Sequence, residues 1–493
     1  MSTLCKTPAE ARRQAFRHTG LPLCLMAIAC FLSGFFAEGT TDIIVRWSPL
    51  AMVLLASAVA GLWFAKKLTV ERLIVILMIA GVALRIAYAL YTGYRIRQHD
   101  VWSVTANKGH MGYIQYIAHN LALPDTNETW QFYHPPLHHI IAGLLYRILE
   151  NGGMDPTIVA EKLQLLTTFY SCAAIVVCDR LFAAAGLSDR ARALADAVIV
   201  FHPSFLLVGG GLNNDMLCIL LACASLLFFV KWWRDDKRTG ALALCGLFMG
   251  LSMMAKVSGV MLAFPYAAAF LWRLWQQRKR PWPPIRQYLI FGLIAVPIGM
   301  WYPVRNLLLF GQSFNYVPYL GNGSKQYIGD FSVLQRLFGF TSVQVSSPYQ
   351  TITRDSYNIP LSMFKTSLFG EANMKGGTWA FILLGAAILL SLIALVHMLT
   401  CLSKKSLRRD NLHAVWTIMW AALVGSYVLF CFKYPHVCSQ DFRYLVILLP
   451  IAAMYLGRLL DDDQSRLTHG LVCTLTGIFC FSSTMVYALP MIW

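Results

Sequence analysis

The stretch NNDMLCILLACASLLFFVKWW, residues 213–233, decides the fold of this chain. Three polar residues, Asn213, Asn214 and Asp215, precede a long apolar run, and Lys231 begins a basic cluster that continues to residue 238. About 20 apolar residues in a helix cross the hydrocarbon core of a bilayer. Since clusters of Lys and Arg mark the cytoplasmic ends of such helices, the segment predicts a transmembrane helix whose polar start lies on the outer side.

The composition extends this interpretation to the whole chain. Of its 493 residues, 57% are hydrophobic and 13% are charged, and the mean hydropathy is +0.55, which excludes an ordinary water-soluble domain. The net charge of +17 is spread over short clusters between apolar runs, so it does not indicate a nucleic-acid partner. Most of the 13 cysteines lie inside apolar segments, which argues against a disulfide framework. The sequence predicts an all-α, polytopic transmembrane helical bundle.

The length needed to cross a bilayer divides the sequence into about thirteen spans. The basic clusters then orient the spans, with the amino terminus in the cytoplasm and the carboxyl terminus outside. Residues 135–149 are apolar but precede an acidic linker, so we expect them to lie in the outer interface while 163–180 cross. The expected crossings are 20–37, 48–65, 73–93, one within 137–180, 193–211, 215–233, 240–255, 257–274, 287–304, 377–400, 412–431, 443–458 and 468–489.

Unusual polar residues lie next to the outer ends of these helices. Such side chains are costly at membrane depth and usually line a cavity or a functional path. A cluster on one face therefore predicts a single site. Besides the turn at 213–215, the cluster comprises Asp100 and His134 in the first outer loop, Lys256 at a bend, Arg305 and Asn306 at a helix end, Glu371 before the next helix, and Asp441 and Arg443 at the start of another.

The order of these segments resembles the GT-C superfamily of integral membrane glycosyltransferases, and most nearly its protein mannosyltransferase and aminoarabinose transferase branch. The resemblance implies a lipid-phosphate sugar donor, a catalytic acidic residue at the position of Asp100, and an active site at the outer membrane surface. The segments that carry it are Asp100, GHMGYIQYIAHNLALP (109–124), YHPPL (133–137), NNDMLCILLACASLLFFVKWW (213–233), GLFMGLSMMAKVSGVML (246–262), WYPVRNLLLFG (301–311) and DFRYL (441–445).

On this resemblance the chain divides into three parts. Residues 1–72 form a cytoplasmic tail and two extra transmembrane helices, 73–458 form the GT-C-like catalytic region, and 459–493 form a last transmembrane helix. The outer loops 94–134 and 311–376 are expected to form the active site, and the second is long enough to act as a lid or binding segment.

Sugar transfer from a phosphate needs a base or a metal ligand near the acceptor, and cations that hold the departing phosphate. Asp100 is the candidate base, or alternatively the ligand of a divalent metal; a solvated loop carboxylate is the structural alternative. Glu371 is a candidate second acid. Arg305, Arg443 and Lys256 are candidate ligands of the donor phosphate, because Arg binds phosphate with a bidentate fork and Lys binds it as a point charge. Snorkelling to the interface is their structural alternative.

The stretch YHPPLHHII, residues 133–141, predicts a proline-started helix with a polar tip at the membrane surface. We expect His134 and Tyr133 to lie beside Asp100, with His134 in a catalytic or phosphate-binding role. His134 and His138 are four residues apart, but the prolines place His134 before the helix, so the metal signal is weak. The other candidate substrate-binding residues are His138, Asn213, Asn214, Asp215, Asn306 and Asp441, although Asp215 could cap its helix and Asp441 could neutralise Arg443.

The sequence favours a glycosyltransferase that moves a sugar from a polyprenyl-phosphate-linked donor to a glycan, lipid or protein acceptor. Two alternatives are a secondary transporter, whose ionisable residues would lie near the bilayer midplane, and an enzyme of the O-antigen ligase or polymerase type. We expect an integral protein of the plasma (inner) membrane with an extracytoplasmic active site, or of the endoplasmic reticulum membrane in a eukaryote. A divalent metal is the one cofactor considered, and no nucleic-acid partner is expected.

Overall fold

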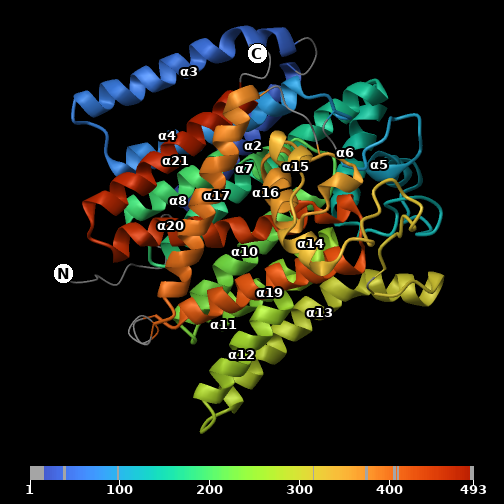
Figure 1. Cartoon of the computed structure of the whole chain (residues 1–493). Coiled ribbons are helices and arrows are strands. Elements are labelled where there is room, and N and C mark those ends of the chain that lie inside the picture. Colours follow the sequence, from blue (N-terminus) through green and yellow to red (C-terminus); the bar gives the residue numbers. More distant parts are fainter. Residues whose placement is uncertain are drawn as a thin grey trace.

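The computed structural model describes residues 16–36, 40–96, 99–314, 316–371, 376–403, 407 and 410–488. In these residues the chain is helical, and its only β-structure is two isolated bridges (Figure 1). The predicted cytoplasmic tail before residue 16 and most of the basic cluster at 404–409 lie outside the described residues. The predicted all-α class is confirmed.

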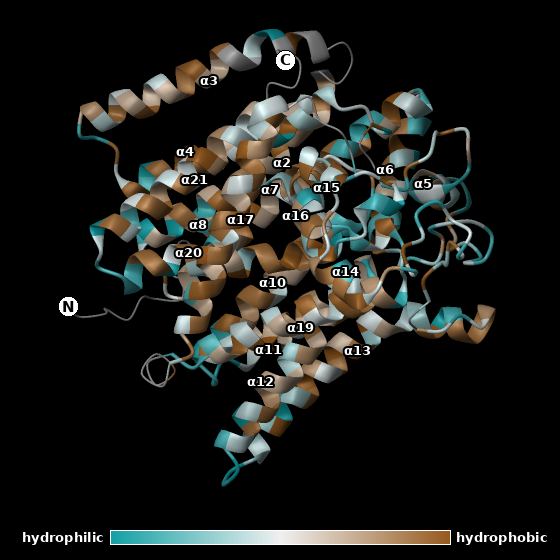
Figure 2. Cartoon of the chain, viewed as in Figure 1, coloured by the Kyte–Doolittle hydropathy of each residue, from teal (hydrophilic) through white to brown (hydrophobic). Residues whose placement is uncertain are grey.

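Nine helices of the described chain are long and apolar enough to cross a membrane, or ten if one bent pair counts as a span. Apolar residues run along these helices, whereas hydrophilic residues concentrate in the segments that connect them (Figure 2). The predicted polytopic bundle is therefore confirmed. The nine are α2 with the turn before it (Phe16–Ser33), α4 (Val70–Tyr91), α7 (Pro156–Ala184), α10 (Asp215–Arg234), η3 with α12 (Val257–Gln276), α13 (Trp282–Phe310), α17 (Gly377–Thr400), α19 (Leu412–Lys433) and α21 (Arg466–Tyr487).

The predicted count of thirteen spans is not confirmed. Helix α3 (Thr40–Phe64) is apolar only over Leu50–Phe64, and α11 (Thr239–Ala255) is a further short apolar helix. Helices α8 (Asp189–Phe201) and α9 (Pro203–Gly209) form the pair that bends by 46°, since the proline that starts α9 lacks the donor that would continue α8.

The predicted span at 443–458 also begins too early, because the helix starts at residue 449. Three short 3₁₀ turns, between residues 437 and 448, precede α20 (Leu449–Asp462). Asp441 and Arg443 therefore lie in an irregular segment before the helix rather than at its first turn. The opposite error occurs in α13, which continues to Phe310 beyond the expected end at 304 and so places Arg305 and Asn306 inside the helix.

Helices α7 and α10 form the centre of the bundle, and most of their side chains are buried. Helix α10 packs against α7 on one side and α11 on the other, and α11 in turn packs against α13. Helix α8 packs against α20, and α17 against α21, in the other half of the bundle (Figure 1). Helix α3 lies along the edge of the molecule, where it contacts α4.

One end of the bundle carries the predicted outer loops, which prove partly helical. The first contains α5 (Gly109–Asn120), and the second contains α14 (Val333–Phe338), α15 (Ser342–Ser346) and α16 (Ile359–Phe369). Helix α6 (Leu137–Asn151) begins directly after Pro136, as the proline-rich stretch predicts. With 15 residues, α6 is shorter than the roughly 20 residues that a crossing needs, which agrees with a place in the interface.

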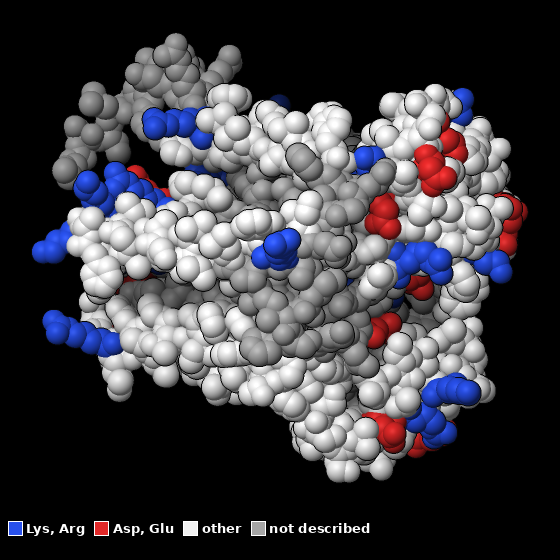
Figure 3. All heavy atoms as spheres, turned by 90° about the horizontal axis from the view of Figure 1, so that it is seen from above, with Lys and Arg blue, Asp and Glu red and all other residues white. Residues whose placement is uncertain are grey.

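The opposite end of the bundle collects the basic clusters. Arg234 contacts Asp410 at 2.8 Å and donates to the carbonyl of Ala185, and Arg273 contacts Asp236 at 3.1 Å. In the space-filling view, charged side chains gather toward the two ends of the molecule and the middle carries few (Figure 3). This separation is the charge distribution expected of a membrane-spanning bundle.

The separation of the two ends predicts the outcome of topology labelling. Thr105 and Lys237 are both exposed, one in the first outer loop and the other in a basic cluster. A cysteine at Thr105 should react with a membrane-impermeant maleimide in intact cells, because a charged reagent does not cross the bilayer. A cysteine at Lys237 should react only after permeabilisation, and the parent chain serves as the background control. Labelling of Lys237→Cys in intact cells would invert the predicted orientation.

Candidate active site

A polar cavity of about 260 Å³ lies among the segments that follow α4, α16 and α19. Residues from five separate parts of the sequence line it, so it exists only in the folded chain. The ionisable lining residues are His99, Asp100, Tyr133, Glu371, Arg443 and Tyr444. The structure thus brings four of the residues singled out from the sequence into one cavity, and a fifth, Asp441, lies buried beside it. The four are Asp100, Tyr133, Glu371 and Arg443.

Asp100 adopts a backbone conformation that is uncommon for a residue with a side chain. Its φ is +57°, in the left-handed region, where Asp and Asn occur more often than bulkier residues. The turn is held by a hydrogen bond from the His110 amide to the Asp100 carbonyl (3.0 Å) and by a bridge between Val101 and Gly109. A positive φ at a residue with a side chain costs conformational energy, and residues in such conformations occur most often at functional sites, where the surrounding structure holds them in place.

Gly109 is required for this turn. Its φ is +67°, and a Cβ on Gly109 would overlap the carbonyl oxygen of Asp100 and the Trp102 ring. Only glycine allows the backbone to approach Asp100 this closely. The glycine at the start of α5 therefore fixes where the Asp100 carboxylate lies.

Arg443 is the cation that faces Asp100. One guanidinium nitrogen lies 3.6 Å from Asp100 Oδ2, and Nε lies 3.9 Å from Asp441 Oδ2. Burial alone would raise the pKa of Asp100, but the charge of Arg443 and the neighbouring histidines lower it below its ordinary value. The Asp100 side chain is 39% exposed, so an ionised carboxylate remains within reach of a substrate.

His99 is a residue of the candidate site that the sequence does not single out. Its Nδ1 lies 3.5 Å from Glu371 Oε2, and its Nε2 lies 3.3 Å from Asp441 Oδ2. Burial and Arg443 oppose protonation, but the two carboxylates raise the pKa of His99 above its ordinary value. The feature of the sequence that points to His99 is its position directly before Asp100. His99 therefore ties the first outer loop to the segments after α16 and α19.

Asp215 and Lys256 form a buried ion pair behind the cavity. The Asn214 amide donates to the carbonyl of Ala255 at 2.7 Å, and Asn213 Oδ1 accepts from the Asp215 amide at 3.2 Å. Asp215 is the first residue of α10 rather than its cap. None of these four residues lines the 260 Å³ cavity. The charge of Lys256, a predicted phosphate ligand, is already matched by Asp215.

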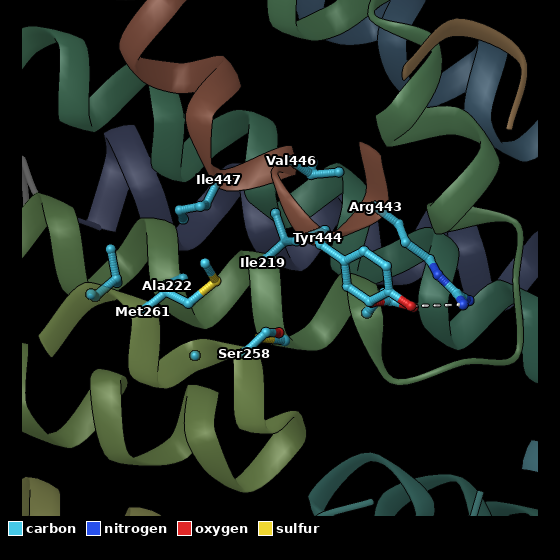
Figure 4. A pocket seen from close by; sticks show the side chains of 12 residues that line it. Ile219, Ala222, Ser258, Met261, Arg443, Tyr444, Val446 and Ile447 are labelled. Atoms are coloured by element: carbon cyan, nitrogen blue, oxygen red, sulfur yellow. Dashed lines mark hydrogen bonds between the residues drawn. The ribbon is translucent and has the colours of Figure 1, made fainter. Parts of the chain in front are cut away.

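Tyr444 separates the polar cavity from a small apolar pocket of about 30 Å³. Its hydroxyl accepts from Arg443 at 3.3 Å (Figure 4), and the Lys256 ammonium lies 5.3 Å from the centre of its ring. Figure 4 shows Ile219, Met261 and Ile447 around the apolar side. The Tyr444 side chain therefore contacts two of the three cationic candidates, Arg443 and Lys256, and lines both spaces.

The histidines of the proline-rich stretch form a buried stack rather than part of the cavity wall. His110 and His139 share a hydrogen bond of 2.9 Å, and the His134 ring stacks on His110 with centroids 5.5 Å apart. His138 contacts the carbonyl of Leu212 at 3.0 Å. Burial lowers the pKa of His134, so its ring is neutral. Tyr133 lines the cavity as expected, whereas His134 and His138 do not.

Arg305 lies away from the cavity lining. It donates to the carbonyl oxygens of Leu123 (3.5 Å) and Pro124 (3.2 Å) and to Asn306 Oδ1 (3.1 Å). These contacts hold the end of the first outer loop against α13. The phosphate-binding role of Arg305 and the substrate-binding role of Asn306 stay predictions.

His99, Glu371 and Asp441 provide a donor set for a divalent metal beside Asp100. One ligand atom from each lies within 4.8 Å of the others. In the described part of the chain, Asp441 Oδ2 is buried and accepts no hydrogen bond. A nitrogen and two carboxylate oxygens suit a divalent transition metal, so these side chains fit the metal that the sequence associates with Asp100.

Comparisons with known proteins agree with this architecture. Residues 133–301 match the family described as dolichyl-phosphate-mannose-protein mannosyltransferase. The archaeal oligosaccharyltransferase AglB from Archaeoglobus fulgidus, solved with an inhibitory peptide and a dolichol-phosphate, matches with a TM-score of 0.51 and 12% identity over 86% of this chain. This chain spans 56% of the length of AglB. No curated protein matches it.

Two structures of ArnT from Cupriavidus metallidurans, in the apo state and bound to undecaprenyl phosphate, give TM-scores of 0.38 and 0.37 at 15% identity. They cover 84% and 83% of this chain and 77% of ArnT. The match over residues 133–301 and the fold shared with AglB agree with the predicted resemblance to the GT-C superfamily of integral membrane glycosyltransferases.

The close approach at Gly109 generates a stability prediction. Gly109→Ala should cost about 1–3 kcal/mol, because the new Cβ meets backbone in a conformation that alanine rarely adopts, and it should lower the midpoint of thermal unfolding. Gly470→Ala is the matched control, since Gly470 lies in α21 with no atom within 4 Å of an added Cβ; it should be neutral or stabilising. Equal midpoints for the two variants would contradict the required turn.

Proposed function

We propose that this chain transfers a sugar from a polyprenyl-phosphate-linked donor to an acceptor hydroxyl or amine at the membrane surface. The observation that carries the proposal is the cavity in which the exposed carboxylate of Asp100 faces the guanidinium of Arg443. The GT-C fold and the mannosyltransferase family match support the same reaction. The structure of AglB includes a dolichol-phosphate, which is a lipid carrier of the proposed kind.

Asp100 is the proposed base. The acceptor oxygen or nitrogen attacks the anomeric carbon of the donor sugar, its proton passes to Asp100, and the lipid phosphate leaves with the bonding electron pair. A carboxylate with a lowered pKa is ionised at neutral pH and ready to accept this proton. A single displacement of this kind inverts the configuration at the anomeric carbon.

Arg443 is the proposed ligand of the donor phosphate. Its guanidinium can bind phosphate with two parallel hydrogen bonds, and its contact with Asp100 is long enough, at 3.6 Å, to be exchanged for a phosphate oxygen. Such an exchange separates the roles of the two residues, because Asp100 is then free for the acceptor. Glu371 acts beside them as the proposed second acid and contacts His99.

The charge balance of the site supports a divalent metal. Four carboxylates lie close enough to the basic groups of the site to interact with them electrostatically. The carboxylates are those of Asp100, Glu371, Asp441 and Asp215, and the basic groups are those of Arg443, His99 and Lys256. Four carboxylates and two permanent cations leave an excess of negative charge, which opposes the approach of a phosphate. His99, Glu371 and Asp441 would hold a divalent cation, which would supply positive charge to stabilise the leaving phosphate.

The acceptor is proposed only as a class: a glycan, a lipid or a protein. The segment 317–326, which belongs to the second outer loop, contributes Val317, Tyr319 and Leu320 to the cavity wall. This wall mixes aromatic, apolar and polar groups and so fits an amphipathic acceptor. The protein is integral to a membrane; we propose the plasma (inner) membrane with the site outside, or the endoplasmic reticulum membrane in a eukaryotic host.

The role of Asp100 is tested by Asp100→Asn. The substitution keeps the size of the side chain and removes its charge, so the variant should fold, bind the lipid-linked donor and lose about 10²- to 10⁴-fold in transfer rate, or roughly 3 to 5 kcal/mol of barrier. The rate is measured on purified protein in nanodiscs with a radiolabelled donor. Asp125→Asn is the matched control, because Asp125 is an exposed carboxylate of the same loop that lies outside the cavity lining.

Two measurements separate the alternatives for Asp100 and for the class of protein. A folded Asp100→Asn variant with the parental transfer rate would remove Asp100 from the reaction, and solute transport by that variant would favour the transporter class. Loss of the parental activity on chelation, with recovery on adding a divalent metal, would support a metal at His99, Glu371 and Asp441; retention of activity in chelator would remove the metal from the reaction and leave Asp100 as the base.

Phosphate recognition is tested by comparing the two arginines. Arg443→Ala should lower kcat/KM for the donor by about 10- to 100-fold, since a hydrogen bond to a charged group contributes about 1.5–3 kcal/mol. Arg443→Lys should recover part of this loss, because it restores the charge but not the fork. Arg305→Ala should have the smaller effect of the two on donor KM, as its contacts are to backbone carbonyls. A normal donor KM in Arg443→Ala would move the phosphate to another cation.

A further inference from the structure

A second group of metal-ligating side chains lies at the end of the bundle opposite the polar cavity. His397 and Cys401 are one helical turn apart at the end of α17, and Asp462 is the last residue of α20. Helix α17 begins at Gly377, a few residues after Glu371. At about 1.5 Å per residue, His397 therefore lies about 30 Å further along the helix axis, so this group is separate from the proposed active site.

The helix geometry places His397 and Cys401 on the same face of α17. The Cys401 amide donates to the His397 carbonyl at 3.0 Å, so the α-helical spacing continues to Cys401 and stacks the two side chains. Asp462 then approaches from α20, which packs against α17. Three ligand atoms of three different kinds, an imidazole nitrogen, a thiol sulfur and a carboxylate oxygen, lie within 4.8 Å of one another.

The distances between these atoms match those of a zinc coordination shell. His397 Nε2 lies 3.3 Å from Asp462 Oδ2. Cys401 Sγ lies 3.7 Å from His397 Nε2 and 3.9 Å from Asp462 Oδ2. Bond lengths of about 2.3 Å to sulfur and about 2.0–2.2 Å to nitrogen or oxygen give tetrahedral edges of about 3.3 Å between nitrogen and oxygen and about 3.6 Å to sulfur.

We propose that His397, Cys401 and Asp462 bind one Zn²⁺ in tetrahedral geometry, with water as the fourth ligand, and that the ion joins the ends of α17 and α20. A thiolate and an imidazole favour Zn²⁺ over Mg²⁺, which prefers an all-oxygen octahedron. Binding replaces the thiol proton of Cys401 by the metal, and the proton is released to water.

The surroundings of the three ligands accommodate a cation. The last carbonyl groups of α17 give the helix end a partial negative charge. Arg458 lies 3.6 Å from Asp462 Oδ2, but its guanidinium also contacts Asp410 at 3.4 Å, which compensates its charge and lets it orient the Asp462 carboxylate as outer-shell partners do. His397 and Cys401 are buried, whereas the Asp462 side chain is 38% exposed and provides the route of entry.

The proposal is tested with Co²⁺ as a spectroscopic probe. The purified full-length protein, stripped of metal with a chelator, is titrated with Co²⁺ alone. One equivalent should produce a thiolate-to-cobalt charge-transfer band, and Zn²⁺ should then remove the band because Zn²⁺ binds such a site more tightly. Zn²⁺, and not Mg²⁺, should raise the midpoint of thermal unfolding, since a ligand that binds only the folded state stabilises it. Absence of the band would overturn the proposal.

Substitutions identify the ligands. Cys401→Ser should abolish the band, and Asp462→Asn should weaken Co²⁺ binding at least about tenfold. Cys438→Ser is the matched control, because Cys438 lines the polar cavity beside the other metal-binding group and its loss should leave the band unchanged. A band that survives Cys401→Ser or disappears in Cys438→Ser would refute the site. If Cys401→Ser does not fold, Asp462→Asn decides, and unchanged Co²⁺ affinity in that variant would also refute it.

Discussion

The guanidinium of Arg443, a side chain that is only 13% exposed, is the group on which the arrangement of the outer end depends. A charge at this depth is tolerated only where opposite charges and hydrogen bonds surround it. Asp100 and Asp441 meet this requirement from segments more than 300 positions apart in the sequence, and His99 adds Glu371 to the same network. The need to compensate one cation therefore brings the first outer loop, the end of the second and the irregular segment before α20 into a single site.

The same network has consequences for how a donor would enter. On the proposed function, a phosphate competes with Asp100 for Arg443, so donor binding and activation of the base are linked through one side chain. Tyr444 extends the linkage, because it contacts both Arg443 and Lys256. The buried pair of Asp215 and Lys256 is held between α10 and the break after α11, which gives the site a rigid rear wall.

Much of this arrangement follows from the sequence. Basic clusters orient the helices, and that orientation alone predicts that Asp100, Glu371 and Arg443 share a face. The position of His134 could not be predicted in the same way, because the direction of a side chain beside two prolines depends on the histidines that α5 and α6 bring to it. The 3₁₀ turns before α20 are equally invisible in hydropathy, since their residues are as apolar as those of a helix. His99 carries no motif and is recognised only by its contacts.

The closure between Asp100 and Gly109 also divides the first outer loop into two functional units. The bridge between Val101 and Gly109 joins the two ends of the segment 101–108. Several residues of this segment, including Trp102 and Lys108, are exposed. The exposed positions of this excursion can therefore change in sequence without displacing the carboxylate at its base, while Val104 stays anchored through its hydrogen bonds with Tyr94 and Gln115.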